Sequence, residues 1–498
     1  MYLKSCSLFA GSIAQLYSDA YDTMKAYEYK ELDAVDLANL IDDRQVTPAE
    51  LLALAQELTE LKNEALNAIV QTFWELADKQ LNELTNGPFA GIPFLIKNLN
   101  QQVSGTVTTN SSKLFLNELS DQDTTLVSRY KSAGLAIFGK TNTPEFGLAT
   151  TTEPQLHGPT KNPWNLLHST GGSSGGAAAA VASGIVPMAN ASDGGGSIRI
   201  PASCCGLFGL KPTRGRVPIG PFAMEGWGGL STSHAITKSV RDSALLLDCT
   251  QGPELGSPYH APTTDSSFFE THAIEPGKCR IALCLETFNG APYDPQVVEI
   301  TKKAAKNLEN LGHTIEETKL SINPELVRSA HGIIAVSHIG STVKKMAKKL
   351  NQVITEEHLE KVTWNNYLSA QEISGADYAG AIGDIHQMGR IVSEFFTDFD
   401  LILSPSLACA PPRIGALDTM SEDTDRYLSL LYQMIGYTSL FNDTGHPACS
   451  LPLGLNSEGL PIGSQLVASF GNEKLLFQIA NQVEKAGYFQ PILPLRDQ

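Results

Sequence analysis

The stretch GGSSGGAAAAVASGIVPMANASDGGGSIRIPAS, residues 171–203, holds two serine-in-glycine clusters separated by an alanine-rich run. The clusters are Gly171–Gly176 and Gly194–Ser197. Glycine loses much conformational freedom on folding, so glycines beside small hydroxyl residues indicate backbone that bends sharply or approaches a ligand closely. A flexible linker is a poor alternative, because apolar runs, Arg199 and Pro201 continue the stretch. The pattern is therefore typical of a nucleophile site.

The whole chain has the composition of a globular protein. Its 498 residues suffice for one large α/β domain or two smaller ones, with 42% hydrophobic and 18% charged residues. The net charge of −17, from 36 Lys and Arg against 53 Asp and Glu, argues against nucleic acid as a direct partner. No apolar run approaches the length that spans a membrane, so we expect no membrane partner either.

Cysteine and histidine spacing argues against metal and disulfide chemistry. None of the eight cysteines forms a C-x-x-C pair, and the 11 histidines show no H-E-x-x-H spacing. We therefore expect no metal and no cofactor, and reduced thiols that suggest a cytoplasmic location.

The chain begins with a segment that lacks a clear helical or strand pattern. Residues 1–23 contain only a short apolar core, which does not resemble a secretory signal. We predict an N-terminal arm over residues 1–28 and a single large domain over 29–498. One hypothesis is that translation begins at Met24, or that the leader is dispensable.

Beyond the arm, helical and strand patterns alternate, which predicts an α/β fold. Thr47 to Glu50 form a capping box with proline at the first helical position, which predicts a helix from Pro48 to about Leu61. The apolar strand predicted over residues 91–97 ends in Lys97, although lysine is almost never fully buried unless paired. That lysine is either functional or simply solvated at the strand exit. A mostly helical insert over about 323–398 interrupts the alternation and is where we expect substrate-specific elements.

Two short motifs match known patterns only formally. Residues 134–141 satisfy the phosphate-loop spacing, but the intervening positions are themselves a predicted strand, a helix precedes them, and Pro144 follows closely. Residues 171–175 satisfy G-x-S-x-G with Ser173 at the centre, but Pro163 and polar residues replace the buried strand that this nucleophile elbow requires. Neither motif predicts function well.

Ser197 is the better nucleophile. A strand is predicted over residues 185–191, a tight loop over 193–196 and a short helix over 197–205, so backbone N–H groups of consecutive glycines would form an anion-binding nest. Such donors stabilise the oxyanion of an acyl-transfer intermediate. We expect Arg199 to pair with Asp193 and brace the loop. No histidine lies in either cluster, so a desolvated lysine is the alternative base.

Several runs together identify the family. GIPFLIKN with Lys97, GGSSGG, SDGGGSIRIPAS, GLKPTRG and GHPACSLPLGLNSEGLPIGSQLVA strongly resemble the amidase signature family, from about Leu32 onward. The resemblance implies a central mixed, twisted β-sheet covered by helices on both faces. It also implies an acyl-enzyme mechanism with a Ser-cisSer-Lys triad, in which Ser197 is the nucleophile, Ser173 the bridging serine on a cis peptide, and Lys97 the base. The spacing from Ser197 selects Ser173 rather than Ser174.

The same resemblance implies an oxyanion hole built from the N–H groups of Gly194, Gly195, Gly196 and Ser197. Two positions depart from the family pattern: Asn98 replaces the usual aspartate, which changes the charge near Lys97, and Gly194 replaces a larger residue, which would enlarge or loosen the pocket.

Within the family, NTPEFG, TTEPQLHGPTKNPWN and the run from RIPAS to KPTRGRVPIGP are similar to 6-aminohexanoate-cyclic-dimer hydrolases. The implied function is hydrolysis of carboxamide C–N bonds in small linear or cyclic amides. The alternative is the glutaminase subunit of a tRNA-dependent amidotransferase. The sequence leaves a homodimer open as the assembly. Specificity is expected to lie in the helical insert and around Phe146, Trp164 and Trp227.

Overall fold

A computed structural model of the protein describes residues 24–83 and 85–490. The hypotheses about residues 1–23 therefore lie outside the described residues. Residues 26–28 of the expected arm belong to a short helix, α2 (Ala26–Tyr29), whose Tyr29 side chain is buried and donates a hydrogen bond to the carbonyl of Ile185.

An 11-stranded mixed sheet forms the centre of the molecule, in the order β1-β3-β2-β6-β8-β7-β12-β13-β11-β9-β10. Its strands are β1 (Ile69–Thr72), β2 (Pro93–Lys97), β3 (Ala136–Thr141), β6 (Met188–Asp193), β7 (Phe208–Lys211), β8 (Thr232–Thr237), β9 (Arg280–Leu283), β10 (Thr314–Glu317), β11 (Leu401–Pro405), β12 (Ala448–Leu455) and β13 (Pro461–Ala468). β2 runs parallel to both β3 and β6, whereas β8, β7, β12 and β13 pair antiparallel along the middle of the sheet. A separate hairpin pairs β4 (Lys161–Asn162) with β5 (Asn165–Ser169).

Alternating side chains along the strands divide the core into two layers. In β11, Leu401 and Leu403 belong to the main core, while Ile402 between them belongs to a second core on the opposite face. Because successive strand residues point to opposite faces, both faces of the sheet are apolar and both need helices to cover them.

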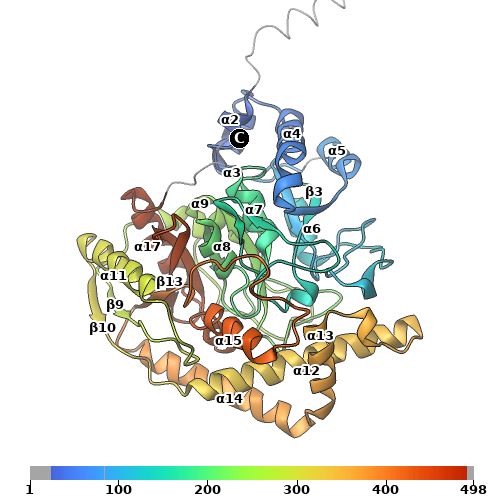
Figure 1. Cartoon of the computed structure of the whole chain (residues 1–498). Helices are drawn as coiled ribbons and strands as arrows, with labels where there is room; N and C mark the ends of the chain where they lie inside the picture. Colours follow the sequence, from blue (N-terminus) through green and yellow to red (C-terminus); the bar gives the residue numbers. More distant parts are fainter. Residues whose placement is uncertain (1–23, 84, 491–498) are drawn as a thin grey trace, which may run out of the picture.

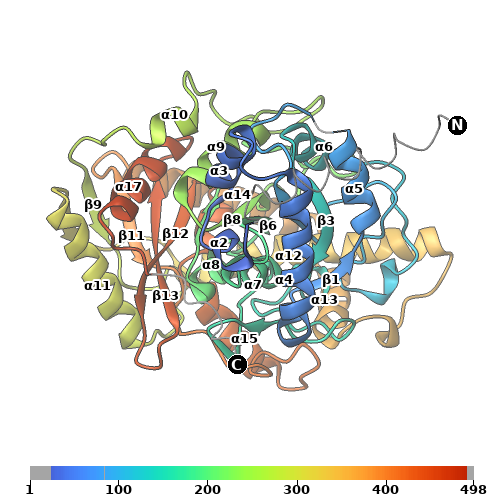
Figure 2. The same cartoon turned by 90° about the horizontal axis from the view of Figure 1, so that it is seen from above.

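Helices cover each face of the sheet (Figure 1). The helices that contribute to the main core include α3 (Ala34–Asp42), α4 (Pro48–Leu66), α5 (Trp74–Asn82), α6 (Thr125–Ser132), α7 (Gly175–Ala182), α8 (Arg199–Cys205), α9 (Val240–Thr250), α10 (Phe268–His272), α11 (Pro295–Asn310) and α17 (Glu473–Lys485). Figure 2 looks onto the side where α3, α4 and α17 lie nearest the viewer. The predicted mixed sheet with helices on both faces is confirmed.

The opposite face is covered by long helices from the segment between β10 and β11. They are α12 (Pro324–Leu350), α13 (Lys361–Glu372) and α14 (Gly375–Phe395), joined by two later helices, α15 (Thr424–Met434) and α16 (Ser439–Asp443). Val327, Ala330 and Ile334 of α12 pack against the second core, as do Ile385 and Met388 of α14. These helices lie along the bottom of Figure 1, and α12 lines the site described next.

None of the helices within residues 24–83 and 85–490 is long and apolar enough to cross a membrane.

Candidate active site

Lys97 is the last residue of β2, a strand in which every side chain is buried. Its neighbour β6 runs parallel to it, so the carboxyl ends of the two strands meet at the same edge of the sheet. The Lys97 side chain is fully buried there, and burial lowers its pKa to about 7, an effect that the more distant charge of Asp193 partly offsets. The structure therefore places a lysine that can be neutral near pH 7 inside the protein.

Three serine hydroxyls surround the Lys97 ammonium nitrogen. Nζ lies 2.7 Å from Ser173 Oγ, 2.8 Å from Ser174 Oγ and 3.0 Å from Ser192 Oγ. Ser174 also donates to the carbonyl oxygen of Ser192 at 3.2 Å. Its single O–H is thereby used, so Ser174 can only accept a hydrogen bond from Lys97.

Ser173 and Ser174 reach Lys97 because they precede the buried helix α7, which packs on β2, β3, β6 and β8. Every residue of α7 is small and buried, which lets the helix approach the sheet closely. The peptide bond between Gly172 and Ser173 is cis, as the family resemblance implied. The strand before the cluster, β5, belongs to the separate hairpin rather than to the central sheet, so the hydrolase-elbow interpretation is excluded structurally.

The glycine-rich loop after β6 is held by the buried Asp193 carboxylate. Asp193 accepts hydrogen bonds from the N–H groups of Gly196 at 2.7 Å and Ile198 at 3.1 Å, and it pairs with the Arg199 guanidinium at 2.9 Å. Although burial alone would raise the pKa of Asp193, the charge of Arg199 holds it well below its usual range. The predicted Asp193–Arg199 pair is confirmed. Asn442 of α16 donates a further hydrogen bond to the same carboxylate at 2.9 Å.

The expected oxyanion donors do not all remain free. The N–H of Gly196 is taken by Asp193, so Gly196 braces the loop instead. Within the described part of the chain, the N–H groups of Gly194, Gly195 and Ser197 donate to no other residue. The loop thus offers three backbone donors in place of the four that were expected.

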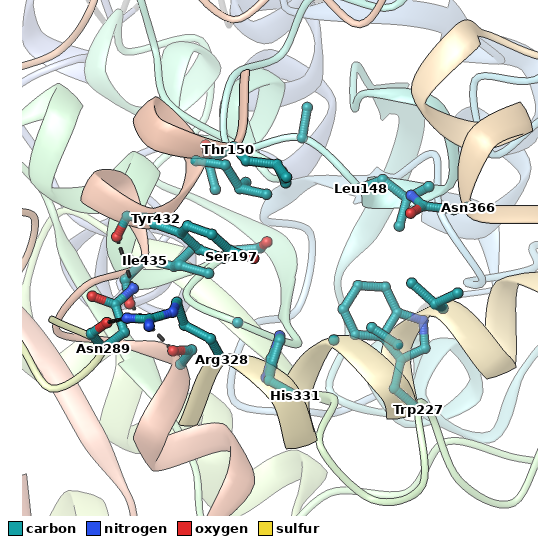
Figure 3. A pocket seen from close by; sticks show the side chains of 18 of the residues that line it. Leu148, Thr150, Ser197, Trp227, Asn289, Arg328, His331, Asn366, Tyr432 and Ile435 are labelled. Atoms are coloured by element: carbon teal, nitrogen blue, oxygen red, sulfur yellow. Dashed lines mark hydrogen bonds between the residues drawn. The ribbon is translucent and has the colours of Figure 1, made fainter. Parts of the chain in front are cut away.

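Ser197 and Gly195 line a cavity of about 190 Å³ that α12, α15 and the loop after β3 enclose (Figure 3). The Ser197 hydroxyl makes no hydrogen bond to any described residue. Ser173 lies behind the cavity wall: a methyl group on Gly147, another lining residue, would sit 3.2 Å from Ser173 Oγ. The structure therefore joins Lys97 directly to Ser173 and places Ser197 on the wall of the adjacent cavity.

A histidine that the sequence analysis did not identify also lines this cavity. His331 of α12 lies 2.7 Å from the buried Asp443 carboxylate through Nδ1, and its Nε2 lies 3.2 Å from where a methyl group on Gly195 would sit. Burial disfavours the charged ring, but the charge of Asp443 outweighs this and raises the pKa of His331. No local pattern signalled the pair, because its two members are 112 residues apart.

The two departures from the family pattern have structural counterparts. Asn98 donates to Thr109 Oγ1 at 2.7 Å and accepts from the Thr109 N–H at 3.0 Å, so its amide holds a neighbouring loop. At Gly194 the expectation of a larger pocket is wrong, because the Trp227 ring fills the space: a methyl group on Gly194 would lie 3.0 Å from Trp227 Cε3.

The expected specificity residues meet the cavity unevenly. Trp227 lines it, together with six residues of α12 and Asn366 of α13 from the helical insert. Phe146 instead packs in a small core with Phe115 and α12, and Trp164 donates to the carbonyl of Cys205. The lining residues Arg328, Asn289 and Tyr432 were not singled out from the sequence.

The structure excludes a phosphate-binding loop at residues 134–141. Gly139, Lys140 and Thr141 all lie within β3, and the buried Lys140 ammonium donates to Thr108 Oγ1. Among the described residues, no group of three or more His, Cys, Asp or Glu side chains could hold a metal ion.

Comparisons with known proteins place the chain in a family. The Amidase family model matches residues 50–477. A 6-aminohexanoate-cyclic-dimer hydrolase from Paenarthrobacter ureafaciens is 34% identical over 467 residues, which cover 91% of this chain and 94% of the relative. The chain belongs to the amidase signature family of hydrolases, which act on amide C–N bonds.

Solved structures give the same answer at the level of the fold. A structure of 6-aminohexanoate cyclic dimer hydrolase superposes with a TM-score of 0.89 at 32% identity, covering 95% of this chain and 99% of that one. A glutamyl-tRNA(Gln) amidotransferase subunit from Thermotoga maritima is more distant, with a TM-score of 0.75 at 26% identity over 96% of this chain and 99% of that one.

Proposed function

We propose that this protein hydrolyses small linear or cyclic amides through an acyl-enzyme on Ser197, with Ser173 as the proton relay and Lys97 as the base. The observation that carries the proposal is the fully buried Lys97 Nζ, 2.7 Å from Ser173 Oγ and next to the cavity that Ser197 lines. A general base works best when its pKa lies near the working pH, and burial brings the pKa of Lys97 to about 7.

The hydroxyls around Lys97 suit its neutral form. A neutral amine has two N–H donors and one lone pair, and Ser174 and Ser192 can accept the two N–H bonds. The lone pair is then directed at Ser173, whose hydroxyl can donate to it. This arrangement supports Ser173 as the group that passes protons to and from Lys97.

In the first half of the reaction, Ser197 Oγ attacks the amide carbonyl carbon as its proton moves to Ser173 and the Ser173 proton moves to Lys97. The N–H groups of Gly194, Gly195 and Ser197 would stabilise the oxyanion. When the intermediate collapses, the C–N bond breaks, Ser173 protonates the departing amine nitrogen, and Lys97 returns a proton to Ser173. An acyl-enzyme ester and a free amine result.

In the second half, water replaces Ser197 as the nucleophile. Its proton passes through Ser173 to Lys97, its oxygen attacks the ester carbonyl, and the Ser197 oxygen leaves with the proton that Ser173 returns. The products are a carboxylic acid and the restored site.

The function of an amidotransferase glutaminase subunit is less well supported, because the similarity to the Thermotoga maritima protein is lower than that to the 6-aminohexanoate-cyclic-dimer hydrolase. The names of the 6-aminohexanoate-cyclic-dimer hydrolases support small amides with aliphatic chains as substrates. The cytoplasmic location and the homodimer considered from the sequence stay predictions.

A panel of aliphatic, aryl, peptide and cyclic amides, with glutamine included, tests the proposal on the purified chain. We expect release of amine from at least one simple amide, loss of that activity in Ser197→Ala, and no loss in Ser341→Ala, which changes an exposed serine of α12. Hydrolysis of glutamine alone would support the glutaminase alternative instead. Full activity of Ser197→Ala would overturn the proposed nucleophile.

A further inference from the structure

An arginine lies at one end of the cavity, and none of the Asp or Glu side chains that the structure describes forms an ion pair with it. Arg328, on α12, donates through Nη1 to the backbone carbonyl of Asn289, and its guanidinium carbon lies 6.0 Å from the centre of the Tyr432 ring. Figure 3 shows these three residues together at one end of the cavity. None of the ion pairs formed between described residues includes Arg328.

Most N–H groups of the Arg328 guanidinium are free to bind a ligand. It carries five N–H groups, and the bond to Asn289 is the only hydrogen bond it makes to the described part of the protein. A planar guanidinium with free N–H groups can bind a carboxylate through two parallel hydrogen bonds. The hydrogen bond to Asn289 and the Tyr432 ring hold the guanidinium in place, which reduces the side-chain entropy that Arg328 loses when a ligand binds.

The surroundings favour an anion at this position. No described residue that lines the cavity carries a carboxylate, although the whole chain has a net charge of −17. Among the described lining residues, the only other side chain that can be cationic is His331, three residues along the same face of α12. The remaining lining is largely apolar, with residues such as Leu428, Leu431 and Ile435. A substrate group that fits would have an aliphatic body and a negative end.

The geometry of the proposed reaction sets which part of the substrate faces Arg328. The departing amine takes its proton from Ser173, and Ser173 lies behind the lining residue Gly147, which directly precedes Leu148 in the chain. Leu148, Asn366 and Trp227 form the end of the cavity opposite Arg328, with Ser197 and His331 between the two ends in the view of Figure 3. The amine group therefore leaves toward Leu148, and the acyl group extends toward Tyr432 and Arg328.

We propose that the cavity selects amides whose acyl chain ends in a carboxylate, and that Arg328 binds this carboxylate. This inference rests on the proposed amide hydrolysis at Ser197 for the direction of the acyl chain. The substrates would be half-amides of aliphatic dicarboxylic acids, and the acid product would be the free dicarboxylate.

Binding to an inactive variant tests the inference without turnover. In the Ser197→Ala background, isothermal titration calorimetry would compare the mono-p-nitroanilides of glutaric and adipic acid with p-nitroanilides in which an isopropyl group replaces the carboxylate. We expect the anionic ligand to bind about tenfold tighter or more, consistent with a charge-assisted bidentate contact. Equal affinities would overturn the inference.

Variants of Arg328 show whether this residue is responsible. Arg328→Gln removes the charge but keeps an N–H donor for Asn289, and it should bring the affinity ratio close to 1. Arg328→Lys keeps the charge without the fork and should retain part of the preference. Lys348→Met, which removes an exposed cation from the far end of α12, should leave the ratio unchanged. A preference that persists in Arg328→Gln would contradict the assignment.

Turnover by the wild-type chain separates this inference from the proposed function. Cleavage of both anilides with equal kcat/KM would retain the amidase function and overturn the carboxylate preference. Absence of cleavage of every amide would overturn the function, while the calorimetric ratio would still decide whether the cavity binds the carboxylate.

Discussion

Lys97 is a weak base or a strong one according to what surrounds its nitrogen. Burial removes the water that would stabilise the ammonium, and the nearest groups are neutral hydroxyls rather than carboxylates. Asn98, where the family usually has aspartate, directs its amide at Thr109 instead, donating to Oγ1 at 2.7 Å. Burial therefore decides whether the lysine can accept a proton at neutral pH.

Replacing the proposed base, Lys97, should abolish efficient turnover without unfolding the protein. Lys97→Met removes the proton acceptor and also removes the cost of burying an amine, so we expect amide kcat/KM to fall by about 10³-fold with thermal stability retained. Steady-state kinetics and circular dichroism measure the two effects. Lys303→Met, on an exposed face of α11, is the matched control. Activity of Lys97→Met within tenfold of wild type would contradict the role.

The pH dependence of kcat/KM reports the same group. The folded pKa of Lys97 is lowered from 10.5 to about 7, so the neutral base predominates above pH 7 and is lost below it. We expect kcat/KM for an uncharged amide to fall about tenfold per pH unit below pH 7 and to level off above it. If kcat/KM instead kept rising up to about pH 10, Lys97 would titrate as an ordinary lysine, which would contradict the lowered pKa.

The close approach of Gly194 and Trp227 leads to a third prediction at the scale of single residues. Gly194→Ala should push the Trp227 ring, because the added methyl group would lie 3.0 Å from Cε3. We expect kcat/KM to fall about tenfold as the oxyanion loop or the ring moves. Adding Trp227→Leu should restore part of the loss, and a double-mutant cycle measures the coupling. Strictly additive effects would show that the two positions act independently.

At the scale of elements, the loop between β6 and α8 depends on one buried ion pair. Asp193 and Arg199 are both fully buried, and Asp193 also accepts backbone hydrogen bonds from Gly196 and Ile198. Arg199→Met would leave the carboxylate buried without its partner, which costs about 3–5 kcal/mol. Urea unfolding should show this loss. Arg390→Met, which breaks an exposed pair with Glu394, should change stability far less.

Helices and strands with a clear capping motif or apolar pattern could be predicted from the sequence. The Thr47–Glu50 capping box forms as expected and starts α4 at Pro48, although the helix continues to Leu66, beyond the predicted end. The strand pattern left Lys97 either functional or solvated at the strand exit, and its complete burial excludes the solvated alternative.

Other elements left no local pattern to detect. The helix α7, with the sequence GGAAAAVA, is buried on all sides and therefore shows no polar face. The strand β8 is fully buried yet polar in sequence, and the Nε2 atom of its His234 lies 2.8 Å from Ser243 Oγ, a partner that only the fold brings near. His331 and Arg328 enter the site because α12 packs under the sheet, and such long-range packing leaves no trace in neighbouring residues.

At the scale of the whole molecule, the site is assembled from both cores. The proposed base and relay lie on β2 and before α7, while α12, α15 and α16 supply the cavity wall and the support of Asp193. Residues as far apart as Gly147 and Ser439 line one cavity, so the site exists only when the full sheet has formed and both faces are covered.

Buried lysines should make global stability depend on pH. Lys140 is buried in β3, and burial lowers its pKa from 10.5 to about 7. Between pH 7 and 10.5 the unfolded chain therefore binds more protons at this residue than the folded protein, so its contribution to stability rises with pH in that window. Lys140→Met should raise the free energy of unfolding at pH 7 and reduce its slope by about 1.4 kcal/mol per pH unit between about pH 7 and 9. An unchanged slope in urea titrations would contradict the burial of a neutral amine.

The identity of the nucleophile is the centre of the account, and covalent labelling tests it most directly. The purified chain would be treated with a fluorophosphonate that phosphonylates activated serines, and the modified residue would be mapped by peptide mass spectrometry. We predict a single adduct on Ser197, formed with the same pH dependence as amide turnover and strongly slowed in Lys97→Met. An adduct on Ser173 or on another residue, or undiminished labelling of Ser197 in Lys97→Met, would contradict the assignment of nucleophile, relay and base.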